Sequence, residues 1–288
     1  MYFELMNTRM KKLLIYGYGY TASHLVEFLD PKNYLIIGSS REEKKINSIN
    51  KNIKFINDNL VSNYLLEDDI THILVSVPPN ELGDIFIQNY KEIIIKNKNI
   101  EWIGYLSATN VYGDHMGKLV NELSETKPTT KKGINRLIAE TQWLELISKY
   151  NMPIKIFRLA GIYGPNRNIK ERITKNLVKN IYKEGQFFSR IHVRDIVNIL
   201  NLSMCNLTKN NIYNVSDDFP CNLNVIIEYL CKQNNLIIPK QIKFDDLNLD
   251  YKKESFFSEN KRVDNSLVKT DLSIKLSFPT FKEGYKDL

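Results

Sequence analysis

Two glycines and an alanine near the start of the chain have the spacing of a phosphate-binding turn. Gly17, Gly19 and Ala22 form the pattern Gly-x-Gly-x-x-Ala directly after the apolar stretch 11–16. Gly17 permits a tight turn, Gly19 lets the backbone approach a pyrophosphate, and Ala22 allows close packing of a helix whose N-terminus faces the negative charge. The alternative is a plain tight turn. The position between a strand and a helix favours a dinucleotide site, in which we include Tyr20.

The residues after the second apolar stretch indicate which dinucleotide the site would bind. Proteins that prefer NAD place Asp or Glu about 20 residues beyond the glycines, on the ribose hydroxyls. This chain has the run GSSR at 38–41 instead. Hydroxyls and a guanidinium suit a 2′-phosphate, so Ser40 and Arg41 favour NADP, with NAD as the alternative. The same two residues could also cap the next helix, with Glu42 and Glu43 in its first turn.

Apolar strands alternate with helical patterns over the first part of the chain. We expect strands within KKLLIY, NYLIIGSS, NIKFINDNL, THILVSVPPN, NIEWIGYLSATNVYG and PIKIFRLAGIYGP. Helices are expected at about 22–30, 81–97 and 133–150. Such an alternation, with strands rich in β-branched residues, predicts an α/β fold with a doubly wound parallel sheet covered on both faces.

The regular pattern weakens after Pro165. A helix is expected at 169–183, a short strand in NIYNVSD and two helical stretches after Pro220. We therefore predict a Rossmann-type dinucleotide-binding domain at 10–165, completed by a helix and a strand near 190–216. The region 166–288 is expected to be mainly a smaller C-terminal α/β substrate region.

Five segments together resemble a known family. GYGYTA, YLSATNVYGD, FRLAGIYGPNRN, RIHVRDIV and YNVSDD follow one another in the order and spacing of the extended and atypical short-chain dehydrogenase/reductase superfamily. The chain is most similar to the NAD-dependent epimerase/dehydratase branch, over residues 10 to 270. The resemblance implies a Rossmann domain with a smaller substrate domain. It also implies action on nucleotide sugars or similar small molecules, and a homodimer formed through a helix pair.

The resemblance also implies further cofactor contacts. Asp58 would contact the adenine, and the segment 158–164 would pass near the nicotinamide. The residues that would line the cofactor after the fourth strand are Ser76, Val77 and Pro78. His192 and Asp195 would lie on the helix that follows FSRIHV. Each has a simpler alternative, namely a turn cap for Asp58, an ion pair at a strand end for Arg158, and packing for His192.

The usual catalytic residues of this family are not found at their positions. Family members use a Ser or Thr after the fifth strand and a Tyr-x-x-x-Lys on the next helix, where the tyrosine moves a proton during hydride transfer. Alignment on NRLIAE puts Lys132 at the tyrosine position and Arg136 at the lysine position, and alignment on VYG puts Ala108 at the Ser/Thr position. No tyrosine lies between Gly113 and Tyr150.

Other residues could take over these roles. Ser107 or Thr109 could supply the missing hydroxyl. Arg136 could hold the nicotinamide ribose, although it cannot give up a proton. Lys132 could act as an acid or base only if its pKa fell from about 10.4 toward 7. The nearest alternative proton carriers are Tyr112, Asp114 and His115. For Tyr112 we first expect the simpler role of a packing residue in the VYG turn.

Two functions therefore stay open. The first is an NADP-dependent oxidoreductase or epimerase-like enzyme with relocated acid and base groups. The second is a catalytically silent dinucleotide-binding protein that regulates or assists assembly.

Composition excludes several other classes. The chain has 288 residues and a net charge of +7, but its lysines are scattered among Asn and Ile, which argues against nucleic acid as a partner. No apolar run reaches about 18 residues, so we expect no membrane helix. The first residues do not have the pattern of a secretory signal, and Cys205, Cys221 and Cys231 show no paired spacing. We expect a cytoplasmic protein with reduced thiols and no metal site.

Overall fold

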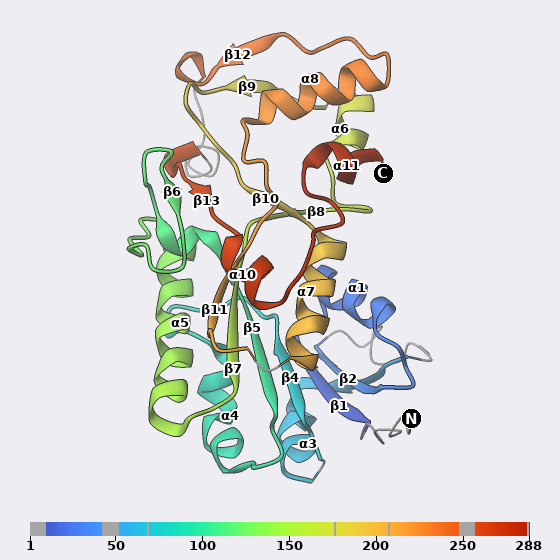
Figure 1. The fold of residues 1–288 in the computed structure, drawn as a ribbon, viewed down its shortest axis with the longest axis vertical. Helices are drawn as coiled ribbons and strands as arrows, with labels where there is room; N and C mark the ends of the chain where they lie inside the picture. The colour runs from blue at the N-terminus through green and yellow to red at the C-terminus, as the bar shows by residue number, and fades with distance from the viewer. Residues whose placement is uncertain are drawn as a thin grey trace, which may run out of the picture. The chain divides into compact units, whose positions relative to one another are not determined.

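The computed structural model describes residues 10–41, 52–67, 69–175, 177–206, 208–247, 257–286 and 288 (Figure 1). The helix start predicted at Glu42 and Glu43 lies outside these residues. The chain divides into two compact units. Unit 1 comprises residues 1–106, 138–156 and 200–207, and unit 2 comprises residues 107–137, 157–199 and 208–288. The functional boundary expected after residue 165 stays a prediction.

A seven-stranded sheet forms the centre of the fold, in the order β11-β7-β5-β4-β1-β2-β3. Its strands are β1 (Lys11–Tyr16), β2 (Tyr34–Ser40), β3 (Lys54–Asn57), β4 (His72–Val75), β5 (Trp102–Ala108), β7 (Ile154–Leu159) and β11 (Ile212–Val215). The pairs of β1 with β2 and β4, of β2 with β3, and of β4 with β5 are parallel. The predicted Rossmann-type parallel sheet is confirmed.

The register of the sheet brings three strand ends to one level. Tyr16, the last residue of β1, pairs with Ser39 of β2 and with Val75 of β4. Ser40 pairs with Asn57, the last residue of β3. Because parallel strands end at the same edge, the turns that follow β1, β2, β3 and β4 share that edge.

Among the described residues, four helices follow strands of unit 1. They are α1 (Tyr20–Phe28), α3 (Val61–Glu67, after the 3-10 turn η1 at Asp58–Leu60), α4 (Ile85–Lys96) and α5 (Lys131–Tyr150), whose first residues belong to unit 2. The helix expected at 81–97 begins later, because Asp84 caps it by accepting a hydrogen bond from the backbone N–H of Ile87 at 3.0 Å. Residues 80–83 form a turn instead, with Gly83 at φ +100°.

The described residues of unit 2 form three short parallel strand pairs. These are β8 (Gly161–Tyr163) with β10 (Arg190–His192), β9 (Asn180–Tyr182) with β12 (Gln241–Lys243), and β6 (Leu119–Val120) with β13 (Arg262–Val263). Its other elements are η2 (Thr109–Tyr112), α6 (Lys170–Thr174), α7 (Val193–Cys205, whose last residues belong to unit 1), α8 (Leu223–Gln233), η3 (Phe244–Asp246), α10 (Ser266–Asp271) and α11 (Phe281–Lys286).

Three expectations about this region are corrected. The helix expected at 169–183 is wrong beyond Thr174, because residues 180–182 pair with β12 and form β9. The sixth predicted strand is interrupted at Ala160, whose N–H donates to the carbonyl of Val215, so that β8 pairs with β10 instead. After Pro220 the described residues form α8, α10 and α11 rather than two helices.

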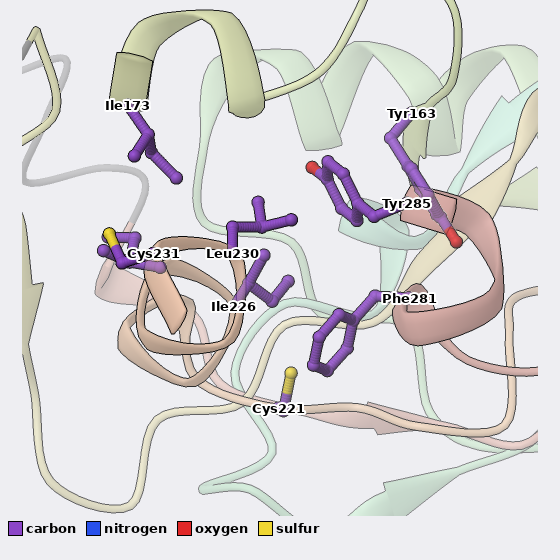
Figure 2. Close-up of a cluster of buried hydrophobic side chains, with 9 residues drawn as sticks. Tyr163, Ile173, Cys221, Ile226, Leu230, Cys231, Phe281 and Tyr285 are labelled. Carbon is purple, nitrogen blue, oxygen red and sulfur yellow. The ribbon is translucent and has the colours of Figure 1, made fainter. Parts of the chain in front are cut away.

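A hydrophobic cluster fixes α8 and α11 within unit 2. Figure 2 shows Tyr163, Phe281 and Tyr285 around α8, which contributes Ile226, Leu230 and Cys231. The rings of Tyr163 and Tyr285 stack with centroids 5.3 Å apart. Cys221 and Cys231 are buried here as free thiols.

Within the described part of the chain, no helix is long and apolar enough to cross a membrane. Among the same residues no group of His, Cys, Asp or Glu could hold a metal ion.

Candidate functional site

Unit 1 contains a cavity of about 670 Å³. It is lined by residues at or just after the ends of β1, β2 and β4 and by residues of η1. Eight residues predicted from the sequence line it together: Gly17, Gly19, Ser40, Arg41, Asp58, Ser76, Val77 and Pro78. Tyr20 and Ala22 lie on α1 and are not part of the lining, and Ala22 is buried under the turn. Eight of the expected cofactor residues therefore come from four chain segments and meet at one cavity, whereas Arg136 is not among the lining residues.

The two glycines of the turn have different roles. Gly17 has φ +94°, and a Cβ atom added to it would lie 2.5 Å from Cγ2 of Val77. Gly19 has a negative φ, and a Cβ atom added to it would meet no protein atom within 4 Å. The backbone carbonyl of Gly19 accepts a hydrogen bond from the N–H of Ser23 at 2.9 Å, so Gly19 begins α1. The fold itself requires Gly17, whereas the space beside Gly19 is open to a ligand.

Ser39 is a lining residue that the sequence analysis did not select. Its side chain is only 1% exposed, and its Oγ has no hydrogen-bond partner among the residues that the structure describes. The signal for Ser39 was its place at the end of an apolar strand, but only the pairing with Tyr16 shows that it reaches the cavity.

The far wall of the cavity is formed by α4 and by the last residue of β1. Tyr16, Ile85, Asn89 and Tyr90 line it, and the Tyr90 hydroxyl donates to the carbonyl of Asp58 at 3.1 Å. Burial, with smaller contributions from Tyr90 and Asp58, raises the pKa of Tyr16 to about 12. Both phenols are therefore neutral hydrogen-bonding groups at ordinary pH. Sequence reasoning missed these residues because they resemble core positions.

The predicted catalytic residues lie at the end of β5, at η2 and in the first turns of α5. Ser107 is buried and Thr109 is half-buried, whereas Lys132 is exposed and Arg136 is half-buried one turn further along the helix. The helix start is fixed next to η2 at Gly133, where an added Cβ would lie 2.9 Å from the carbonyl oxygen of Asn110. Thr130 caps the helix, because its Oγ1 accepts a hydrogen bond from the N–H of Gly133 at 3.2 Å.

The alternative proton carriers after β5 already have protein partners. The Tyr112 hydroxyl donates to Oδ1 of Asn214 at 2.7 Å and accepts from Nη1 of Arg158 at 2.9 Å. Burial raises the pKa of Tyr112, while Arg158 and Asn214 oppose this shift. Nε2 of His115 lies 3.1 Å from the carbonyl oxygens of both Tyr112 and Glu125. Oδ1 of Asp114 accepts a hydrogen bond from the backbone N–H of Asn260.

Only Asp195 lies on the helix that follows FSRIHV; the expectation that His192 would lie there is wrong, because His192 is the last residue of β10 and pairs with Tyr163 of β8. The ring of His192 lies 4.0 Å from that of Phe278, and its Nδ1 accepts from the N–H of Arg194 at 3.2 Å. Asp195 lies in the first turn of α7 and accepts from the backbone N–H groups of Ser277 and Phe278. Burial raises the pKa of Asp195, and these two hydrogen bonds partly offset the effect. These contacts agree with the packing alternative for His192.

Comparison with known proteins supports this assignment of the fold. The model of the NAD dependent epimerase/dehydratase family matches residues 93–216. A functionally unknown conserved protein from Silicibacter pomeroyi DSS is 36% identical, with a TM-score of 0.88 over 96% of this chain and 97% of that chain. UDP-glucuronic acid 4-epimerase from Bacillus cereus, solved in complex with NAD, is 18% identical with a TM-score of 0.75 over 96% of each chain, which shows the fold alone.

One relative is also similar in sequence. The uncharacterized UDP-glucose epimerase YtcB of Bacillus subtilis (strain 168) is 27% identical over 212 residues, which are 62% of this chain and 66% of that protein. The chain spans less than two thirds of the length of the curated relatives it matches.

The parallel sheet with a glycine turn after its first strand is the fold of the short-chain dehydrogenase/reductase class. Residues 93–216 match the model of the NAD-dependent epimerase/dehydratase family, and the chain shares its fold over nearly its full length with the Silicibacter pomeroyi protein. The resemblance found in the sequence is confirmed.

Proposed function

We propose that this protein binds NADP(H) in the cavity of unit 1 and acts as an oxidoreductase or epimerase/dehydratase-like enzyme on a small molecule such as a nucleotide sugar. The observation that carries the proposal is the end of β2. Ser39, Ser40 and Arg41 line the same cavity, and the run 38–41 contains no carboxylate. At the end of β2, hydroxyls and a guanidinium would hydrogen-bond the 2′-phosphate of NADP(H).

The residues of unit 1 would hold the dinucleotide by its phosphates and its adenosine. The backbone at Gly17 and Gly19 would approach the pyrophosphate at the start of α1, and the open space beside Gly19 fits this role. Asp58 and the segment 76–78 would line the adenosine half. When bound, the nicotinamide supplies or accepts a hydride.

The acid and base groups would differ from those of the family pattern. We propose that Arg136 takes the place of the lysine that holds the nicotinamide ribose. Ser107 or Thr109 would offer a hydroxyl to the substrate oxygen. Lys132 would remain in solvent, because it is exposed in the first turn of α5. A cytoplasmic location and a homodimer are kept as predictions from the sequence.

The choice of cofactor is tested by binding. We expect Arg41→Ala to weaken the binding of NADPH by about 1.5–3 kcal/mol, because a charge-assisted contact with the 2′-phosphate is lost. The binding of NADH should change little. Dissociation constants of both nucleotides would be measured by titration for wild type, Arg41→Ala and the control Lys32→Ala, which removes an exposed cation outside the cavity. An equal loss for both nucleotides would contradict the NADP assignment.

Turnover is tested separately. A panel of nucleotide sugars would be screened for reduction of NADP⁺ and for epimerised or dehydrated products. The alternative of a catalytically silent regulatory or assembly protein is not favoured by the comparisons. It would be favoured only by tight NADP(H) binding together with no change in any member of the panel.

A further inference from the structure

Two segments of unit 2 bring large apolar side chains to the same end of a strand pair. The strands β9 and β12 are parallel, with Asn180 opposite Gln241 (Figure 1). Leu177 and Ile238 each lie three residues before one of these paired residues, so both precede the pair at the same end. The side-chain amide of Asn180 donates to the carbonyl of Pro239 at 3.0 Å and connects the two segments at this end.

The hydrophobic cluster of unit 2 uses only some of the apolar residues in these segments. Val178 and Leu236 pack against the cluster around α8. Their neighbours Leu177 and Ile237 are 63% and 92% exposed, and Ile238 is 39% exposed. We call Leu177, Ile237 and Ile238 the apolar ridge. A single exposed apolar residue is ordinary, whereas several at one place on a surface indicate a site of interaction.

The segments that carry the apolar ridge are basic. Residues 172–183 and 229–244 contain seven lysine and arginine residues and no aspartate or glutamate, whereas the whole chain has 40 basic and 33 acidic residues. Four of the lysines in these segments are exposed and close to the ridge in sequence: Lys175, Lys179, Lys232 and Lys240. The partner of the ridge should therefore combine negative charge with an apolar phase.

We propose that the apolar ridge and its four lysines bind the surface of an anionic lipid bilayer. A side chain that is 92% exposed, as Ile237 is, has no protein wall beside it and does not line a groove. Peptides are bound in grooves or along strand edges, whereas a bilayer receives side chains that project from a surface. The aliphatic side chains enter the boundary of the acyl chains, and the lysine ammonium groups stay among the lipid headgroups.

Both parts of the surface are needed for this attachment. Three aliphatic side chains give only weak and reversible binding, and the lysines add an attraction that salt screens. Binding should therefore require anionic lipid and the ridge together. Such binding needs no membrane-spanning helix.

The first experiment measures partition onto vesicles. The full chain, without dinucleotide, is centrifuged with vesicles of phosphatidylcholine alone or of phosphatidylcholine with about 30% phosphatidylserine. We expect binding only to the vesicles that contain phosphatidylserine. Ile237→Ser should lower the partition coefficient about fivefold or more, because an apolar side chain no longer enters the bilayer. Leu123→Ser is the matched control, since it removes another apolar side chain of unit 2, 95% exposed and outside both segments.

A pair of double variants tests the charges. Lys175→Ala with Lys179→Ala should lower the partition onto phosphatidylserine vesicles several times more than Lys32→Ala with Lys98→Ala. The second pair removes two exposed lysines of unit 1 and leaves the same net charge. Equal losses for the two pairs, equal losses for Ile237→Ser and Leu123→Ser, or no binding to anionic vesicles would each overturn the proposal.

A second measurement reports insertion directly. Both tryptophans of the chain, Trp102 and Trp143, are buried, so an added tryptophan in Ile237→Trp is the exposed reporter. Its emission should shift to shorter wavelength when phosphatidylserine vesicles are added. Unchanged emission from vesicle-bound protein would mean attraction by net charge alone and would overturn the proposal.

The other possible occupant of the ridge is a second copy of the chain. Sedimentation velocity without lipid tests this case, and a wild-type dimer that Ile237→Ser abolishes would assign the ridge to self-association and overturn membrane binding. All of these readouts are made without dinucleotide, so their outcome is independent of the proposed function.

Discussion

The guanidinium of Arg158 donates a hydrogen bond to the Tyr112 hydroxyl at 2.9 Å and lies 4.8 Å from the centre of the same ring. The hydroxyl proton of Tyr112 is directed to Asn214. All three side chains are buried in unit 2. The nearest tyrosine after β5 therefore holds the structure together and is not placed to exchange protons with a substrate.

Tyr112→Phe should lower stability and leave function intact. The change removes both hydrogen bonds and leaves buried polar atoms of Arg158 and Asn214 with fewer partners, which costs about 1–3 kcal/mol. Urea unfolding would measure this loss against Tyr150→Phe, a change at an exposed tyrosine at the end of α5 that should be nearly neutral. NADPH affinity should be unchanged. Normal stability combined with a large loss of hydride transfer would instead identify Tyr112 as a proton carrier.

Substitution of the two glycines should separate folding from binding. Gly19→Val should fold, because a Cβ atom added there meets no protein atom within 4 Å, and it should abolish dinucleotide binding by filling the space for the pyrophosphate. Gly17→Val should destabilise the protein, since it combines φ +94° with a contact to Val77. Thermal unfolding and NADPH titration check both variants. Unchanged NADPH affinity in a folded Gly19→Val protein would place the nucleotide elsewhere.

Lys132 and Arg136 should respond differently to replacement by alanine. We expect Lys132→Ala to keep any oxidoreductase activity within about tenfold of wild type, because a positioned general acid or base contributes about 10²–10⁴-fold and Lys132 is exposed. Arg136→Ala should raise the dissociation constant of the cofactor. The measurement is single-turnover hydride transfer at saturating cofactor, with a substrate from the nucleotide-sugar screen. A hundredfold loss in Lys132→Ala with unchanged cofactor affinity would give Lys132 the role of the missing tyrosine.

Acid should destabilise the protein through His72. This side chain is buried in β4, with Nδ1 2.8 Å from Oγ1 of Thr71 and Nε2 3.3 Å from the carbonyl of Met204. Burial lowers the pKa of His72 to about 4; Lys11 adds to this shift and the Met204 carbonyl opposes it.

In the unfolded chain the imidazole of His72 takes up a proton near pH 6.5, whereas in the folded chain it does so only near pH 4. The stability due to neutral His72 is therefore complete above about pH 6.5 and is lost as the pH falls toward 4. The loss between about pH 7 and about pH 5 should be close to 2 kcal/mol. Urea unfolding of wild type and His72→Gln at both pH values isolates this contribution. Parallel pH dependences for the two proteins would exclude His72 as its source.

The parts of the fold that are encoded locally could be predicted from the sequence. β1 has the predicted bounds, and the glycine turn after it depends only on neighbouring residues. β9 could not be predicted, because Asn180–Tyr182 becomes a strand only by pairing with Gln241–Lys243, far along the chain. The role of Ser39 depends in the same way on the register between β1 and β2. Asn89 and Tyr90 line the cavity because they lie on the face of α4 that is turned toward it. Helical periodicity alone does not specify which face of a helix is turned toward a cavity.

The place of β1 within the sheet has a consequence for synthesis on the ribosome. β1 is the first described strand to be made, and it pairs with β2 on one side and with β4 on the other. Until His72–Val75 has emerged, one edge of β1 has no partner, and the segment 76–78, which lies against the glycine turn at Gly17, does not yet exist. The nascent chain therefore cannot use the dinucleotide as an early folding template. Nucleotide can stabilise the protein only after the central strands have assembled, a late step for a sheet built from distant segments.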